Sequence, residues 1–409
     1  MKLTLIEKQK IRLSILSIAE NIDVGKMENI PFSLISGKGG VVLFFAYIFK
    51  FFKNDKYGDI ALKLLEDIIS ESNQIGNNYS LANGFSGLGW LFQHLVNIDF
   101  LHPSEVEVLD SLDAMIYDSL ETNAENYDLL YGLIGKGVYF LERKDSVYSG
   151  KALKKIVHLL YENAMSPNSE FAYWIDSLNS ELNNDTTISL GLAHGMSGIV
   201  SFLIEINQQG IETLKTGELI DQAVKWIFKQ KLTTKDRTSI FPAYQGENSS
   251  SRMAWCQGDL GILIMLEKLN ERNLFTDKIQ LLKTCLDRDL ESSYVDCQIH
   301  NKLLDVTFCH GTSGIMHLFN RLSLNNQINN ASKIQYWLKK TLDSIATNRS
   351  TLLSKTGVTT FSLGEDNTNK IWMEEVGILQ GASGVGLVLL SLLFPQECNW
   401  DKIFLTNLT

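Results

Sequence analysis

The chain has 409 residues, of which 44% are hydrophobic and 21% charged, and it contains only 5 prolines. This composition excludes a largely disordered chain and supplies ample apolar material for a core. The formal net charge of −10 argues against nucleic-acid binding, which needs clustered lysine and arginine, so no nucleic-acid partner is expected.

The N-terminal segment, residues 1–20, carries charged residues between positions 7 and 12, and these interrupt the apolar core that an export signal requires. The most apolar stretches, 41–49 and 385–394, are about half the roughly 20 residues that span a bilayer, so no transmembrane segment is expected. The 5 cysteines all lie in the C-terminal part of the chain, at positions 256, 285, 297, 309 and 398. This distribution is typical of a reducing cytoplasm and not of a disulfide scaffold.

One short pattern, Gly-x-x-Gly followed by an apolar run, recurs along the whole chain and predicts a repeat architecture. The seven copies, here called repeats one to seven, begin at Gly37, Gly84, Gly132, Gly195, Gly258, Gly311 and Gly381. Each is expected to open an apolar inner helix, because glycine permits close helix approach at that point.

Amphipathic segments with helical periodicity lie between the copies, at 59–70, 151–160 and 219–230 for example. Each repeat is therefore expected to consist of an outer helix, a loop and then a more apolar inner helix. The hairpins are expected to stand side by side in a solenoid or a closed ring. Inner helices this apolar favour the ring. Polar insertions near 166–192, 231–251 and 350–374 are expected to form loops, with room for short hairpins, within one domain over 1–409.

The residues just before the glycine pairs are the candidates for chemistry, because equivalent positions of a ring meet at one end of its axis. Repeats one, two and seven offer no obvious metal ligand there. Repeat three has Asp128, repeat four has His194, repeat five has Cys256, and repeat six has Cys309 and His310. Reactive side chains therefore occupy nearby positions in four successive repeats.

Two thiolates and one imidazole are good zinc ligands, and three protein ligands leave a fourth tetrahedral position for water or substrate. If each residue is considered alone, Cys256 and Cys309 are best interpreted as small buried hydrophobic residues, and His310 as a histidine that caps or packs against a helix. Their coincidence at matched repeat positions favours a metal site. The cysteines outside the glycine motif are expected to be structural: Cys285, Cys297 and Cys398. The same holds for His94, His102, His158, His300 and His317, although His317 could face the same lumen.

The strings GLAHG at 191–195, WCQG at 255–258 and CHG at 309–311, set within seven glycine pairs, resemble the lanthionine synthetase C-like family. The resemblance spans nearly the whole chain. It implies an all-α fold, an α/α toroid of seven hairpins with loop insertions and one zinc ion per chain. The implied enzyme is a cyclase that adds cysteine thiols of a dehydrated precursor peptide to dehydroalanine or dehydrobutyrine, forming the lanthionine or methyllanthionine thioether rings of lantibiotics.

Carried over position by position, the resemblance assigns zinc to Cys256, Cys309 and His310, and acid–base work to His194 and Asp128. Arg252, four residues before Cys256, matches a further family position near the site. Family members often carry tyrosine after the first zinc cysteine, where this chain has Gln257. The resemblance also implies a separate dehydratase and an exporter as partners, and a cytoplasmic location that is peripheral to the membrane if these proteins form a complex.

The residues support this chemistry. A substrate thiol has a pKa of about 8.5, and zinc binding deprotonates it. Addition to the double bond gives an enolate that His194 can protonate, with Asp128 orienting the imidazole and Arg252 stabilising the oxygen charge. The plain alternatives are a packed core histidine at 194, a helix N-cap at 128 and a solvated charge at 252.

Three other functions remain open. In a relative of the same family, glutathione supplies the thiol in place of a peptide cysteine. A helical peptide-binding scaffold with structural zinc would need a fourth protein ligand. An α/α-toroid glycosidase needs two carboxylates facing one cleft, and the positions beside the glycine pairs supply only Asp128.

Overall fold

The computed structural model describes residues 3–30, 32–106, 108–121, 126–165, 170–175, 188–234, 237–269, 275–287, 305–324, 330–363 and 370–408. Inner helices begin directly after the first glycine of each pair, as the sequence predicts. They are α2 (Lys38–Phe52), α4 (Phe85–Asn97), α6 (Leu133–Glu142), α9 (Met196–Gln208), α11 (Asp259–Lys268), α14 (Thr312–Leu324) and α16 (Ala382–Leu393). The inner helices are apolar on almost every face; in α16, residues 382–392 are all buried.

Outer helices surround this inner set and are amphipathic. They are α1 (Leu5–Asn21), α3 (Asp55–Ser70), α5 (Leu109–Asp118), α7 (Ser149–Glu162), α10 (Thr213–Lys229), α12 (Phe275–Asp287) and α15 (Ala331–Ser350). In α3, for example, Tyr57, Ala61, Leu64 and Ile68 recur at helical spacing and are buried against α2. The helices predicted within 59–70, 151–160 and 219–230 are confirmed as parts of α3, α7 and α10.

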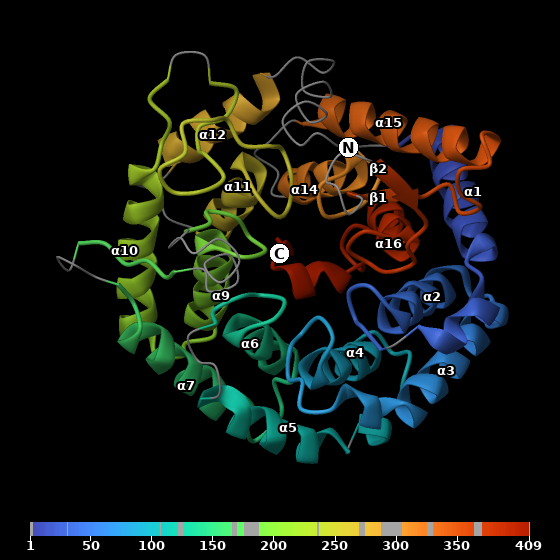
Figure 1. The fold of residues 1–409 in the computed structure, drawn as a ribbon, viewed down its shortest axis with the longest axis horizontal. Helices are drawn as coiled ribbons and strands as arrows, with labels where there is room; N and C mark the ends of the chain where they lie inside the picture. The colour runs from blue at the N-terminus through green and yellow to red at the C-terminus, as the bar shows by residue number, and fades with distance from the viewer. Residues whose placement is uncertain are drawn as a thin grey trace.

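The inner helices form a closed cycle, because each one contacts the next and α16 contacts α2. Figure 1 shows this inner ring inside the outer one. The prediction of an all-α double ring is therefore confirmed, and the open solenoid is excluded. The pairing of the helices differs from the expectation: each inner helix packs against the outer helix that follows it in the chain, and α16 packs against α1. The first helix thus completes the seventh pair.

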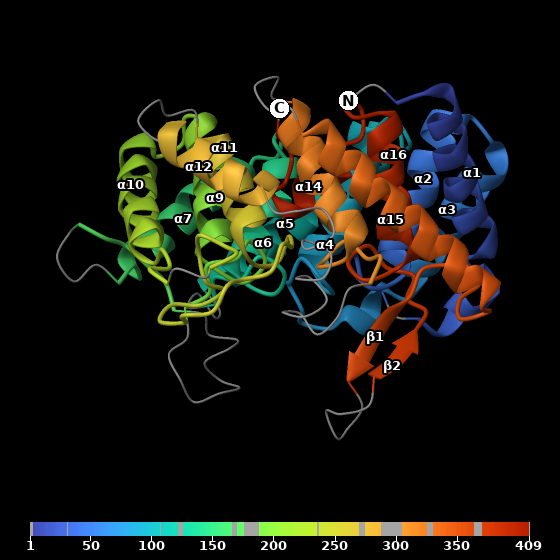
Figure 2. The same cartoon turned by 90° about the horizontal axis from the view of Figure 1, so that it is seen from above.

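The insertions lie between these helices. The described residues of 231–251 contain no helix or strand, and Ser189 forms an isolated bridge with Tyr244. The 350–374 insertion contains an antiparallel hairpin, β1 (Thr360–Leu363) and β2 (Lys370–Met373), in which Thr360 pairs with Met373. Figure 2 shows the hairpin projecting from the end of the ring that lies away from both chain termini. Residues 166–169, 176–187 and 364–369, for which loops are expected, lie outside the described residues.

Short 3-10 helices complete the described elements: η1 (Val24–Asn29), η2 (Ser72–Ile75), η3 (Pro103–Val106), η4 (Ser119–Glu121) and η6 (Trp400–Phe404). None of the helices in the described part of the chain combines the length and the apolar character needed to cross a membrane.

The last of these short helices, η6, lies in the middle of the ring (Figure 1). Its Asp401 carboxylate is buried and accepts hydrogen bonds from Arg321 at 2.7 Å and from His317 at 2.9 Å. The indole N–H of Trp255 donates to the Phe404 carbonyl oxygen at 3.0 Å. The C-terminal segment is therefore bonded to α14 and to the loop that precedes α11, and it fills the centre of the inner ring.

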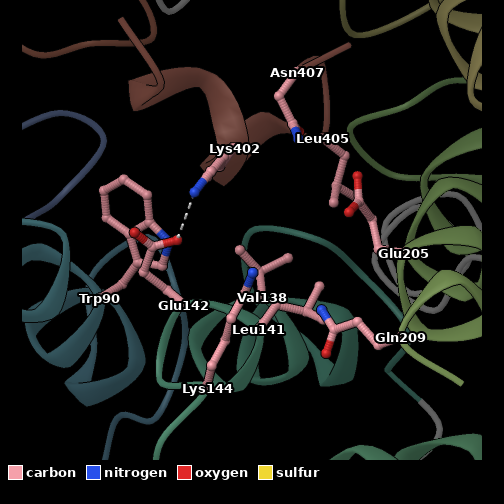
Figure 3. A pocket seen from close by; sticks show the side chains of 10 residues that line it. All are labelled: Trp90, Val138, Leu141, Glu142, Lys144, Glu205, Gln209, Lys402, Leu405 and Asn407. Carbon is pink, nitrogen blue, oxygen red and sulfur yellow. Dashed lines mark ion pairs between the residues drawn. The ribbon is translucent and has the colours of Figure 1, made fainter. Parts of the chain in front are cut away.

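The adjacent Lys402 extends from η6 toward Glu142 at the C-terminal end of α6, with its ammonium 3.6 Å from the carboxylate (Figure 3). A small cavity of about 50 Å³ separates the segment from α4, α6 and α9. Glu142 also contacts Nδ1 of His94 at 2.8 Å, and Nε2 of His94 contacts the Tyr47 hydroxyl at 2.9 Å. This buried polar network joins α2, α4 and α6 to the C-terminal segment.

Replacing Glu142 by glutamine is expected to lower the free energy of unfolding at pH 7 by about 3 kcal/mol. Burial raises the pKa of Glu142, but His94 and Lys402 outweigh it and hold the value at about 2, against 4.5 for an unperturbed glutamate. The unfolded chain therefore binds more protons between these two values. The stabilisation is complete above about pH 5 and is lost as the pH falls toward 2.

Urea denaturation of the wild type and of Glu142→Gln at several pH values between 2 and 7 measures this difference. The gap between the two proteins should close as the medium becomes acidic. Glu397→Gln, an exposed change of the same charge, should behave as the wild type at every pH. A gap that stays constant with pH would contradict an ionised Glu142.

Candidate metal centre

Cys256, Cys309 and His310 form a cluster in which the ligand atoms all lie within 4.8 Å of one another. Zinc with Zn–S distances of about 2.3 Å and tetrahedral angles would hold its ligand atoms roughly 3.5–3.8 Å apart, so small side-chain movements close the site around an ion. Two thiols and an imidazole are also the right chemical types. The three residues predicted as metal ligands are thus brought together, and they fit a metal of this kind.

Two glycines allow the loop that carries Cys256 to take its shape. Gly258 has a φ of 91°, in the region that favours glycine, and a Cβ atom there would lie 1.8 Å from the Arg252 carbonyl oxygen. Gly191 lies under the same loop, where a Cβ atom would lie 1.9 Å from the Cys256 carbonyl oxygen. The glycines of GLAHG and WCQG therefore let the loops of repeats four and five approach closely at the metal cluster.

The electrostatics of the cluster favour a thiolate at Cys256. Its sulfur accepts hydrogen bonds from Cys309 and His310, and together with the nearby charge of Arg252 these hold the pKa of Cys256 well below its ordinary value of 9.0, although burial opposes the shift. The hydrogen bond that Cys309 donates to Cys256, together with burial, raises the pKa of Cys309. The cluster therefore favours the deprotonated form of Cys256, which is the form that binds a metal.

Asp305 lies beside the histidine of the cluster, and no pattern in the sequence predicts this contact. Its buried carboxylate lies 3.4 Å from Nε2 of His310 and accepts the backbone N–H of Thr307 at 2.8 Å. Burial lowers the pKa of His310, but the hydrogen bonds to Asp305 and Cys256 outweigh it and raise the value to about 9. Because Nε2 faces Asp305, Nδ1 is left for a metal, an arrangement common among metal-bound histidines.

His194 and Asp128 lie in contact, with Nδ1 of the imidazole on Oδ2 of the carboxylate. The other oxygen, Oδ1, accepts the backbone N–H groups of Leu130 and Tyr131, each at 2.7 Å. One oxygen of Asp128 therefore stabilises the loop before α6, while the other orients the His194 imidazole. The Asp128 side chain is 2% exposed and that of His194 is 37% exposed. A buried carboxylate therefore holds an imidazole that is accessible to solvent.

Arg252 is half-buried and lies near the cluster, since its charge lowers the pKa of both Cys256 and Cys309. Gln257 follows Cys256, and its amide donates a hydrogen bond to the Tyr244 hydroxyl at 2.7 Å. A tyrosine from the 231–251 insertion thus approaches the position at which the family often carries one. No sequence pattern predicts this contact, because the two residues belong to different loops.

Backbone hydrogen bonds tie the loops of the repeats into a rim around this end of the ring. The Cys309 N–H donates to the Leu379 carbonyl oxygen at 2.9 Å, and the Leu379 N–H donates to Ile35 at 3.2 Å. The pattern recurs between repeats two and three, where the Ala82 N–H donates to Leu130 at 2.9 Å. These hydrogen bonds fix the loops of repeats six, seven and one relative to one another, at the end of the ring that carries the cluster. They also fix the loop of repeat two relative to that of repeat three.

The remaining cysteines and histidines of the described residues stay outside the metal cluster. Cys285 and Cys398 are buried elsewhere, and His317 is a core residue bonded to Asp401. His317 therefore does lie near the ring centre, but as part of the polar network of η6. Cys297 and His300 lie outside the described residues.

The fold and the arrangement of these loops place the chain in a known class. The family model described as lanthionine synthetase C-like protein matches residues 28–405, and the chain belongs to this family. The predicted family membership is therefore confirmed.

Among curated proteins, the chain is similar to the nisin biosynthesis protein NisC of Lactococcus lactis subsp. lactis. The two are 24% identical over 357 residues, which covers 78% of this chain and 79% of NisC. Among solved structures, it is similar to a nisin cyclase, with a TM-score of 0.66 and 19% identity over 98% of this chain and 97% of that chain. This likeness confirms the predicted α/α toroid.

Proposed function

We propose that this protein is a zinc-dependent cyclase that adds cysteine thiols of a dehydrated precursor peptide to dehydroalanine or dehydrobutyrine, forming lanthionine or methyllanthionine rings. The observation that carries the proposal is that, in a member of this family, the Cys256–Cys309–His310 cluster stands on loops of which one, that of Cys256, packs closely at Gly191 against the loop that carries His194 and its partner Asp128. The printed name of the similar solved structure, nisin cyclase, supports the same activity.

Cys256, Cys309 and Nδ1 of His310 would hold the ion. Zinc bound there would supply the positive charge that lowers the pKa of a substrate thiol and keeps the resulting thiolate nucleophilic. Two cysteine ligands keep such a thiolate more electron-rich than three histidines would. Asp305 fixes the ring orientation of His310, because a carboxylate on the second nitrogen sets which nitrogen faces the metal.

The substrate thiolate sulfur forms a bond to Cβ of the dehydro residue, and the electrons of the C=C bond move into an enolate. His194 then delivers a proton to Cα, which completes the thioether without any redox change. Asp128 orients the imidazole by holding Nδ1, so Nε2 is the nitrogen that transfers the proton. Arg252 places a positive charge at the same end of the ring, where it stabilises the enolate oxygen.

The described residues favour an open catalytic site over a closed structural one. Within them, the cluster contains three metal-ligating groups and no fourth. A glycosidase is also disfavoured, because the two carboxylates of the site are engaged: Asp128 with His194 and backbone amides, and Asp305 with His310 and Thr307. Asp128 lines a small pocket with His194, and Asp305 is not among the residues that line it, so these two carboxylates do not share that pocket as glycoside hydrolysis requires.

The proposed activity also implies a domain organisation, partner proteins and a location in the cell. Residues 1–409 would act as one toroid domain, since α1 and α2 both pack against α16. A separate dehydratase must supply the dehydrated peptide, and an exporter must remove the product, so a cytoplasmic location with peripheral membrane association through these partners is proposed.

The test uses the zinc-loaded protein and a synthetic peptide that contains one dehydroalanine and one cysteine. Ring formation leaves the mass of the peptide unchanged but removes its free thiol, so mass spectrometry after alkylation with N-ethylmaleimide separates product from substrate. A second reaction offers glutathione to a dehydroalanine peptide that lacks cysteine.

Loss of the free thiol in the first reaction, dependent on the protein, is the expected result. Glutathione addition without ring formation would replace the proposal by the glutathione-adding activity. If the zinc-loaded protein accelerates neither reaction, both thiol-adding activities are excluded, and a peptide-binding scaffold is the function that remains.

A further inference from the structure

A cavity of about 170 Å³ lies at the end of the ring that carries the metal cluster, between the loops of repeats seven, one, two and three. One water molecule needs about 10–15 Å³ by the same measure, so this cavity accommodates a chain of several non-hydrogen atoms. Its lining is Ile35, Ser36, Asn83, Tyr131, Glu375, Gly377, Leu379, Gln380 and Gly381. None of these residues takes part in the chemistry proposed above.

The cavity adjoins the proposed site through two of its lining residues. The carbonyl oxygen of Leu379 accepts the backbone N–H of Cys309 at 2.9 Å. The backbone N–H of Tyr131 donates to Asp128 at 2.7 Å, and Asp128 holds His194. A peptide whose thiol lies at the metal cluster therefore has this cavity within reach of a neighbouring side chain.

The lining carries one negative charge and no positive one. Glu375 is half-buried, and within the described part of the chain no hydrogen-bond donor or cation contacts its carboxylate. Burial raises the pKa of Glu375, as expected for a carboxylate that has lost water without gaining a partner. Tyr131 is 45% exposed, and its ring offers a face to a cation, while Ser36, Asn83 and Gln380 add exposed polar groups.

We propose that this cavity is a specificity subsite that binds a cationic side chain, lysine or arginine, of the peptide close to the cysteine that reacts. A long apolar stem with a terminal charge suits the volume, and the charge supplies the partner that Glu375 lacks. The identity of the ligand as a substrate peptide rests on the proposed function. The charge preference of the cavity rests on Glu375 and its surroundings alone.

The experiment measures binding, without turnover, to the zinc-loaded full-length protein. Fluorescent peptides carry dehydroalanine and an alanine in place of cysteine, with lysine, glutamine or glutamate placed in turn at positions on either side of that alanine. At one such position, the wild type should bind the lysine peptide about tenfold more tightly than the glutamate peptide. Glu375→Gln should abolish this preference, and Glu375→Lys should invert it.

Glu218→Gln and Glu218→Lys are the matched controls, because Glu218 is exposed on the outer helix α10 and lies in no part of the cavity. They should keep the wild-type preference, which separates a local contact from the overall charge of the protein. Zinc content and circular dichroism establish that the Glu375 variants remain folded.

A wild type that binds the lysine and glutamate peptides equally at every position would overturn the subsite, as would an unchanged preference in Glu375→Lys. Because these peptides cannot cyclise, the result is independent of the ring-forming reaction. Lysine preference in a protein that fails the cyclisation assay would count against the proposed function and leave the cationic subsite standing.

Discussion

Replacing Cys309 by alanine is expected to reduce the zinc content of the purified protein from about one ion per chain to nearly none. The change removes one of three protein ligands. It also removes the strongest influence that lowers the pKa of Cys256, the hydrogen bond from the Cys309 thiol, so the remaining sulfur competes less well against protons. Elemental analysis of protein prepared without chelators measures the result, and ring formation should be lost in parallel.

Cys398→Ala is the matched control, since Cys398 is a buried thiol outside the cluster. Like Cys309→Ala, this variant removes one buried cysteine sulfur, but it should retain its zinc. A wild type that contains no zinc, even after incubation with the ion, would remove the metal site. Zinc retained in full by Cys309→Ala would remove Cys309 from the ligand set.

The second large effect concerns His194. Replacement by alanine should leave the zinc content unchanged and slow ring formation by about 10²- to 10⁴-fold, the range over which general acid catalysis contributes. The imidazole is held by Asp128 and its side chain is 37% exposed, so it is accessible to substrate, and it is not part of the metal cluster. The rate of free-thiol loss from the dehydroalanine peptide provides the measurement.

Two further variants separate catalysis from structure. His158→Ala removes a partly exposed histidine from the outer helix α7 and should cyclise at the wild-type rate. Asp128→Asn keeps an oxygen for the backbone amides of Leu130 and Tyr131 but places an N–H₂ group against His194, which favours the wrong tautomer. Its zinc should remain while its rate falls. Unimpaired ring formation by His194→Ala would exclude His194 from the mechanism.

Much of this arrangement could be predicted from the sequence, because the repeat itself encodes it. A glycine before each inner helix marks where the helix begins, so Gly195 and Gly381 directly precede α9 and α16. The candidate metal ligands could be selected from the cysteines and histidines of the chain because they share a position relative to those glycines. Side chains at matched positions of a closed ring face one end of its axis, and the structure brings Cys256, Cys309 and His310 together there.

The residues that escaped prediction either lie earlier in a loop than the positions beside the glycines or make contacts across the ring. Asp305 lies six residues before Gly311, outside the matched positions, and reaches His310 through a turn of the backbone. His317 and Asp401 are 84 residues apart, and no periodicity relates them. The pairing of α1 with α16 likewise depends on closure of the whole ring, which local pattern does not specify.

The contact of α1 and α2 with α16 also has a consequence for folding kinetics. These contacts join the two ends of the sequence, so their loop-closure entropy must be overcome before they add stability. Neighbouring helix pairs, such as α2 with α3, form from local contacts and should appear first. The ring should therefore close in a late step, and until it does, the apolar edges of α2 and α16 are exposed to self-association. Refolding yield should consequently fall as protein concentration rises.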